Sequence, residues 1–162
     1  MGGERALRAA RTLAEAAGAR VADGWVLPEQ PWDLAAIRLV VQGSLERPSD
    51  EELLVSAVVR GAGAILDVDR DAHVTARLLD ALKRIAPVLD WSACPTMRLD
   101  QTQIRLVARL ANGASARSAA EAEHVSLRTA HRRIAEARNL LGASSTNAAA
   151  AELATAARAW QS

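Results

Sequence analysis

Apolar residues recur every three or four positions at both ends of the chain, which is the period of an amphipathic helix. Near the N-terminus this pattern predicts a helix over residues 4–17, ended by Gly18. In the last third of the chain it predicts shorter helices joined by turns of a few residues. Their ranges are 99–111, 115–122, 126–141 and 146–160. This part of the sequence is therefore expected to be all-α.

The middle of the chain instead alternates short apolar runs with helical stretches. Strands are predicted at 19–28 (alternatively a tight hairpin), 36–41 and 63–66, and helices at 48–61 and 71–86. Ser49 and Glu52 have the spacing of a capping box at the start of the first of these two helices. Strand, helix, strand, helix with short connections predicts an α/β domain with a small parallel sheet.

The helix predicted over residues 126–141 has an apolar side and a basic side. Ser126 is a favourable N-cap, and Gly142 suits a left-handed helix stop. The apolar side is expected to face inward and consists of Ala130, Ile134, Ala137 and Leu141. The opposite side consists of Arg128, His131, Arg132 and Ala135, flanked by Thr129 and Arg133. Such a helix is narrow enough for the DNA major groove, where its guanidinium groups can bind guanine edges or phosphates.

The net charge of +1 conceals opposite charges in the two parts of the 162-residue chain. Residues 95–162 contain 9 Arg and 5 acidic residues, whereas residues 1–94 contain 11 basic and 14 acidic residues. This asymmetry fits a nucleic-acid-binding module joined to a different domain. We therefore expect an α/β domain over residues 1–86, a linker over 87–98 and an all-α domain over 99–162.

Enzymatic, metal-dependent and membrane functions have little support in the sequence. Cys94 is the only cysteine, which excludes an internal disulfide and favours a reducing cytoplasm. It has no nearby histidine, and together with His73 and His124 it lacks the spacing of metal ligands. No run approaches about 18 apolar residues, and no signal-peptide core is present. We expect a cytoplasmic, non-enzymatic protein without a cofactor, a metal or a membrane partner.

Three closely spaced aspartates, Asp67, Asp69 and Asp71, resemble part of a metal-binding loop. A calcium loop also needs a following glycine and a closing glutamate at fixed positions, and neither is present. A solvated turn is therefore the preferred interpretation of this segment.

The C-terminal region resembles the LuxR-type helix-turn-helix of bacterial transcription regulators, over roughly residues 99–157. The motifs that carry the resemblance are Leu99-Asp100-x-x-Gln103, Ala111-Asn112-Gly113-Ala114-Ser115, Val125-Ser126, Thr129-Ala130-His131-Arg132-Arg133 and Leu141-Gly142-Ala143. The chain departs from the family at Gln103 and Arg105, where an acidic pair is usual, and at Thr146, where Arg is usual. The resemblance implies a sequence-specific regulator that binds double-stranded DNA.

The resemblance also implies roles for single residues of the helix-turn-helix. His131 and Arg132 fall at base-reading positions, with Ala135 beside them, where its methyl can contact a thymine methyl. Other residues are better placed for phosphates: Ser126, Arg128, Thr129 and Arg133, with Arg117 as a further candidate. The alternative is that these charges form only a solvated helix face.

The last helix of the family makes the dimer contact, which here implies Ala149, Leu153, Ala156 and Trp160. Leu153 and Trp160 can alternatively close the core of their own domain. A homodimer on DNA places two recognition helices about 34 Å apart, and RNA polymerase is a further candidate partner. A second function hypothesis is an adaptor that uses the four-helix unit for protein interaction or dimerisation and has lost DNA binding.

Residues 37–86 resemble the second half of a response-regulator receiver domain, most clearly at Gly61-Ala62-Gly63-Ala64-Ile65-Leu66. The phosphoacceptor aspartate and the lysine that a receiver requires have no counterparts here. The resemblance therefore implies a shortened receiver relative that is not switched by phosphorylation.

Overall fold

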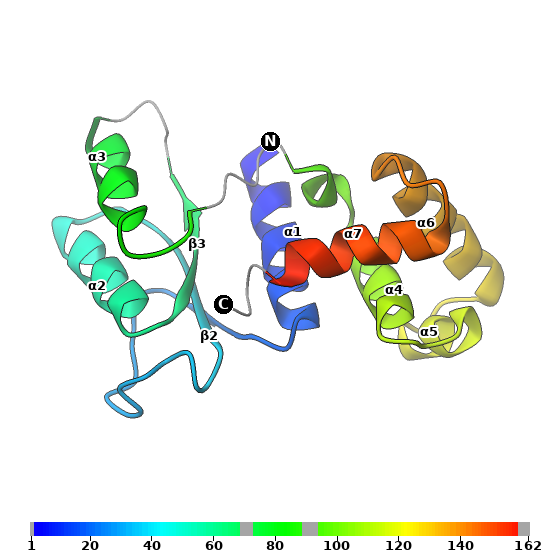
Figure 1. The fold of residues 1–162 in the computed structure, drawn as a ribbon, viewed down its shortest axis with the longest axis horizontal. Coiled ribbons are helices and arrows are strands. Elements are labelled where there is room, and N and C mark those ends of the chain that lie inside the picture. The colour runs from blue at the N-terminus through cyan, green and yellow to red at the C-terminus, as the bar shows by residue number, and fades with distance from the viewer. Residues whose placement is uncertain (1, 69–72, 89–93, 159–162) are drawn as a thin grey trace. The chain divides into compact units, whose positions relative to one another are not determined.

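The computed structural model describes residues 2–68, 73–88 and 94–158 (Figure 1). It divides into two compact units. The first unit consists of Met1–Ala17 together with Trp91–Ser162, and the second unit is Gly18–Asp90. Within the described residues the second unit is α/β and the first is helical. The predicted mixed α/β class with a small parallel sheet is confirmed.

The second unit contains a sheet with the strand order β1 (Arg20–Asp23), β2 (Leu39–Ser44) and β3 (Gly63–Asp67) in its described part. All pairings are parallel, and Val40 of β2 lies opposite Val21 on one side and Gly63 on the other. Within the segment 19–28 only residues 20–23 form a strand, and this strand pairs with β2, so the alternative of a tight hairpin at 19–28 is wrong. Strand β2 also begins three residues later than predicted, since Arg38 has a positive φ of 50° and Leu39 is the first residue of the ladder.

Two helices, α2 (Pro48–Val59) and α3 (His73–Leu82), cover one face of this sheet (Figure 1). Their buried residues Leu54, Ala57, Leu78 and Leu82 share a core with Val41 of the central strand. Trp25 completes this core, and its indole N–H donates to the carbonyl of Ser44 at 3.1 Å. A Cβ on Gly43 would lie 3.0 Å from the Trp25 ring, so the ring packs where only glycine leaves room.

Helix α2 begins differently from the prediction. The N-cap is Arg47, and Pro48 is the first helical residue. The carboxylate of Asp50 accepts hydrogen bonds from the backbone N–H groups of Glu46 at 3.0 Å and Arg47 at 2.9 Å. The predicted capping box of Ser49 and Glu52 is therefore wrong, because Asp50 already binds the free N–H groups at the start of the helix.

The first unit contains α1 (Gly2–Ala16), the 3₁₀ helix η2 (Pro95–Arg98), α4 (Gln101–Ala111), α5 (Ala116–Ala122), α6 (Leu127–Leu140) and α7 (Thr146–Arg158). Helix α1 packs on α4, η2 and α7, and buries Ala9, Ala10, Leu13 and Ala14. The side chain of Arg5 donates to the carbonyl of Arg98 in η2. The predicted domain over residues 1–86 is therefore corrected, since its first helix belongs with the C-terminal helices.

Part of the predicted linker over residues 87–98 also belongs to this unit. Thr96 and Met97 in η2 are 3 % and 5 % exposed, and Leu99 directly after it is completely buried. Two prolines and weak periodicity suggested a linker, but these side chains fill the space between α1, α6 and α7. No helix in the described part of the chain is both long and apolar enough to cross a bilayer.

Candidate nucleic-acid interface

Helix α6 is built by the local signals that the sequence contains. The Ser126 hydroxyl accepts a hydrogen bond from the Thr129 N–H at 3.1 Å and lies 2.8 Å from the Thr129 hydroxyl. Gly142 has a φ of 65°, in the left-handed region that stops a helix. The predicted helix and its N-cap are confirmed, with Leu141 as the C-cap residue.

The apolar side of α6 packs into a core shared with α4 and α5. Ala130 and Ala137 are completely buried and Ile134 is 6 % exposed. Ala130 and Ile134 contact Leu106 of α4 and the α5 residues Ala119 and Ala120. The link between α5 and α6 is short, because the chain turns at His124, whose φ is 52°, directly before Val125 and Ser126. The fold therefore fixes α6 along its inner side and leaves its outer side to solvent.

The outer side of α6 carries the predicted residues. Arg128, His131, Arg132 and Ala135 are exposed, whereas Thr129 and Arg133 on the flanks are partly buried. Ser126 at the start of the helix is exposed, and so is Arg117 in the first turn of α5. Among the described residues, Arg117, Arg128 and His131 have no hydrogen-bond or ion-pair partner, so their polar groups are available to a ligand.

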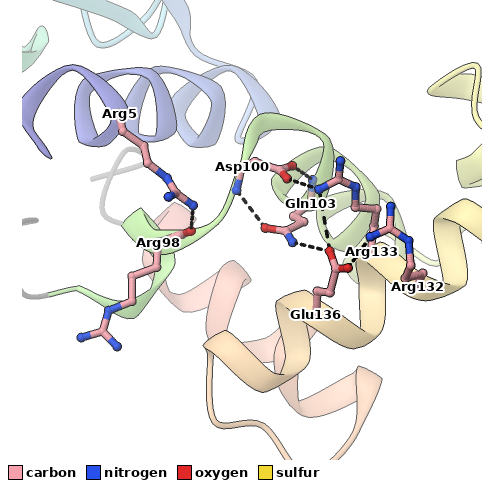
Figure 2. A network of polar contacts seen from close by, with 7 residues as sticks. All are labelled: Arg5, Arg98, Asp100, Gln103, Arg132, Arg133 and Glu136. Carbon is pink, nitrogen blue, oxygen red and sulfur yellow. Dashed lines mark hydrogen bonds and ion pairs between the residues drawn. The ribbon is translucent and has the colours of Figure 1, made fainter. Parts of the chain in front are cut away.

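Two arginines of this surface bind carboxylates, and Figure 2 shows the network. Arg132 Nη1 donates to Glu136 Oε1 one turn further along α6. Arg133 Nη1 lies 2.7 Å from Asp100 Oδ2 at the start of α4, and 3.7 Å from Glu136 Oε2. Arg132 and Arg133 thus differ in their exposure and in the helix that holds them. Arg133 is 35 % exposed and tied to a second helix, while Arg132 is 60 % exposed and tied only within α6.

Gln103 connects the same network to the capping box of α4. Its backbone N–H donates to Asp100 Oδ1 at 2.8 Å, and its side-chain Oε1 accepts from the Asp100 N–H at 2.9 Å. Its Nε2 donates to Glu136 Oε2 at 3.3 Å. Gln103 is buried, at 4 % exposed, and its amide therefore fixes the Oε2 atom of Glu136. The predicted cap of Asp100 with Gln103 is confirmed.

An open groove of about 270 Å³ lies beside the exposed face of α6. Leu110 and Ile134 form apolar lining, and His131, Ala135, Arg138 and Thr146 surround them together with Ala116. Small-molecule sites usually enclose most of their ligand, whereas this groove is open to solvent. It continues the α6 surface, because His131, at a predicted base-reading position, and its neighbour Ala135 border it.

The residues considered for metal binding or catalysis form no site within the part of the chain that the structure describes. Among the described residues, no group of three or more His, Cys, Asp or Glu side chains is arranged to hold a metal ion. Asp67 ends β3, and Asp69 and Asp71 lie outside the described residues. Cys94 is partly buried at the N-cap of η2.

The residues predicted to form a dimer contact lie on α7. Ala149 is completely buried and Leu153 is 1 % exposed, because α7 packs on α4 in the same unit. Ala156 is partly buried, and Trp160 lies outside the described residues. Ala149 and Leu153 therefore offer almost no surface to a second copy. This burial favours the alternative in which Leu153 closes the core of its own unit.

Asp100 and Glu136 were not among the predicted site residues. The spacing of Arg132 and Glu136 on one helix already indicates an ion pair, since residues four apart are neighbours on a helix. No sequence signal indicates the pairing of Asp100 with Arg133, because it depends on how α4 and α6 cross.

In comparisons with protein-family models, with curated proteins and with solved structures, the chain matches none of them.

Proposed function

We propose that this chain is a cytoplasmic transcriptional regulator that binds double-stranded DNA, with α5 and α6 acting as a helix-turn-helix and α6 entering the major groove. The observation that carries the proposal is that α6 has a buried apolar side and an exposed basic side. Its apolar side is fixed in a core with α4 and α5, and its outer side presents Arg128, His131, Arg132 and Ala135 to solvent. A docked helix with a free basic face can read base edges and bind phosphates.

The charge of the two units supports the same proposal. The helical unit contains 12 Arg and 7 acidic residues, a formal charge of +5, and the α/β unit contains 8 basic and 12 acidic residues, a charge of −4. This separation is larger than the one expected from a boundary near residue 94, because α1 belongs with the basic helices. Positive charge on the unit that carries α6 favours a polyanionic partner.

Residue roles follow from exposure and pairing. Arg128 has a free guanidinium group near the N-terminus of α6, where phosphates bind readily, and Arg117 of α5 presents a second free guanidinium to solvent. Arg132 and His131 are placed to read bases, and Ala135 can contact a thymine methyl. Arg133, half-buried between two carboxylates, positions α6 rather than binding a phosphate. In this proposal the α/β unit acts without phosphorylation.

The test is a salt titration of the full chain with a random-sequence duplex of about 20 base pairs, followed by fluorescence anisotropy. For three or four phosphate contacts, log K should fall against log salt concentration with a slope of about −3. Arg128→Ala should reduce that slope by about 1. Arg8→Ala is the matched control, since Arg8 is an exposed arginine of the same unit, 59 % exposed, with an i,i+4 ion pair to Glu4.

The second candidate is a protein-interaction adaptor, and one observation favours it. Asp100 and Glu136 neutralise two of the arginines that a DNA-binding face would use. An adaptor predicts weak binding to duplex DNA without a steep salt dependence. The same titration therefore separates the two functions.

A further inference from the structure

Glu136 lies between an exposed arginine and a buried amide. One of its oxygens, Oε1, accepts from Arg132 Nη1, and the other, Oε2, accepts from Gln103 Nε2 at 3.3 Å. Gln103 is itself fixed by two hydrogen bonds to Asp100 (Figure 2). A continuous chain of contacts therefore runs from the start of α4 to the guanidinium of Arg132.

The contact with Glu136 uses only part of the Arg132 guanidinium. The group has five N–H donors in a planar fork, and the bond to Glu136 is made through Nη1. Among the described residues Arg132 makes no other hydrogen bond, so the donors on Nε and Nη2 stay free. Two such donors are what bidentate binding of guanine O6 and N7 requires. An arginine held on one side and free on the other is pre-organised for such binding.

We propose that Glu136 is a positioning residue for sequence reading: it orients Arg132 toward a guanine edge. The proposal rests on the function proposed above and adds how one base contact is set. Free arginine side chains lose considerable rotamer freedom on binding, and a side chain that is already fixed loses less. The negative charge of Glu136 simultaneously repels phosphates, so it weakens contacts that any DNA sequence offers.

The two effects of Glu136 change DNA affinity in opposite directions. Positioning of Arg132 strengthens binding to the preferred sequence, whereas repulsion of phosphates weakens binding to every sequence. Duplexes are first selected from a random library with the wild-type full chain, which yields a preferred duplex. Binding of Glu136→Gln is then measured on the preferred duplex and on a random duplex of equal length. The two bonds are made by different oxygens of Glu136, and a glutamine has an NH2 group in place of one of them, which would face the donor of either Arg132 or Gln103. We expect the affinity for the preferred duplex to fall about 3- to 10-fold. Affinity for the random duplex should stay equal or rise.

A double-mutant cycle assigns the effect to Arg132. In an Arg132→Ala background, Glu136→Gln should no longer lower the affinity for the preferred duplex, because the side chain that it positions is absent. Glu121→Gln is the control for charge alone, since Glu121 is an exposed acidic residue on the neighbouring helix α5. It should change binding to both duplexes in the same direction.

The possible outcomes distinguish failure of the positioning role from failure of the proposed DNA-binding function. If Glu136→Gln raises the affinity for both duplexes alike, Glu136 only masks Arg132 and the positioning role is wrong. A loss that persists in the Arg132→Ala background also overturns it, because Glu136 then acts through another group. If the wild-type chain selects no sequence and binds no duplex, the proposed DNA-binding function itself fails. Thermal unfolding of each variant confirms that the fold of the unit is kept.

Discussion

Arg133 Nη1 lies 2.7 Å from Asp100 Oδ2, so the middle of α6 is tied to the first turn of α4. The other oxygen of Asp100 caps α4 by accepting from the N–H of Gln103. One carboxylate therefore both starts α4 and fixes α6 against it. The position of the exposed face of α6 depends on this residue, although Asp100 itself belongs to another helix.

Replacing Asp100 should separate these two roles. Asp100→Ala removes the cap and the ion pair, and should lower the free energy of unfolding of the helical unit by about 1–2 kcal/mol. Asp100→Asn keeps a good N-cap acceptor and removes the charge, so it should cost less, about 0.5 kcal/mol. Urea unfolding followed by circular dichroism at 222 nm measures both. Equal losses for the two variants would show that the ion pair with Arg133, rather than the cap, is what matters.

The neighbouring arginines should respond differently to truncation. Arg132→Ala should cost roughly 1–3 kcal/mol of binding free energy on a preferred duplex, relax the sequence preference there and leave stability almost unchanged. Arg133→Ala should lower the unfolding free energy by up to about 1 kcal/mol, because its half-exposed ion pair with Asp100 is lost. Anisotropy titrations and urea unfolding of both variants compare these effects. A preferred duplex that binds Arg132→Ala as tightly as the wild type would contradict the base-reading role.

Features set by neighbouring residues could be predicted from the sequence. Ser126, Gly142 and the capping box of Asp100 with Gln103 act through contacts only a few residues apart, and the structure contains all of them. The alternation of strands and helices in residues 19–86 likewise gave the parallel sheet. At α2, however, Ser49, Asp50 and Glu52 all suit a helix start, and the sequence does not distinguish Asp50 as the residue that caps it.

Pairings between distant segments could not be predicted in the same way. The apolar stripe of α1 shows that one side must be buried, but a stripe of Ala and Leu fits either a sheet or other helices. Its contact with α4 joins residues about 90 positions apart. Asp100 and Arg133 are 33 positions apart, and their contact depends on the packing of α4 on α6. Periodicity identifies which side of a helix is buried, whereas the identity of the partner is a property of the tertiary fold.

The α/β unit provides a separate test at Arg60, which is 8 % exposed. Its Nε donates to the Trp32 carbonyl at 3.1 Å, and its Nη2 lies 2.6 Å from the Pro28 carbonyl, 3.3 Å from that of Glu29 and 3.1 Å from that of Pro31. The guanidinium also lies over the Trp32 ring, 5.0 Å from its centre. One side chain thus satisfies several carbonyl groups of the loop between β1 and β2.

Arg60→Ala should therefore destabilise the α/β unit by roughly 2–4 kcal/mol, because these carbonyls lose a charged donor. Arg60→Lys should also be destabilising, since an ammonium group cannot reproduce the planar fork. Urea unfolding followed by tryptophan fluorescence measures the change. Arg47→Ala is the control, because Arg47 is 78 % exposed and its ion pair with Asp50 spans 3.8 Å; it should stay within about 0.5 kcal/mol of the wild type.

Gly43 offers a further test of the same unit. In Gly43→Ala the new methyl would lie 3.0 Å from two atoms of the Trp25 ring, which is buried and hydrogen-bonded to Ser44. The ring has to move, and such overpacking typically costs about 1–3 kcal/mol. The same fluorescence-detected unfolding measures this loss. An alanine variant as stable as the wild type would mean that Trp25 has another low-energy position.

Leu153 distinguishes a dimer contact from an internal core position. Its side chain is 1 % exposed and α7 packs on α4, so Leu153→Ala should leave a cavity within the helical unit. We expect a loss of about 2–5 kcal/mol in unfolding free energy. The sedimentation coefficient of the folded protein should not change, because the residue has almost no surface to offer to a second copy. Sedimentation velocity and urea unfolding of the same preparations measure the two quantities. A variant that dissociates into a lighter species while keeping its unfolding free energy would instead place Leu153 between two chains.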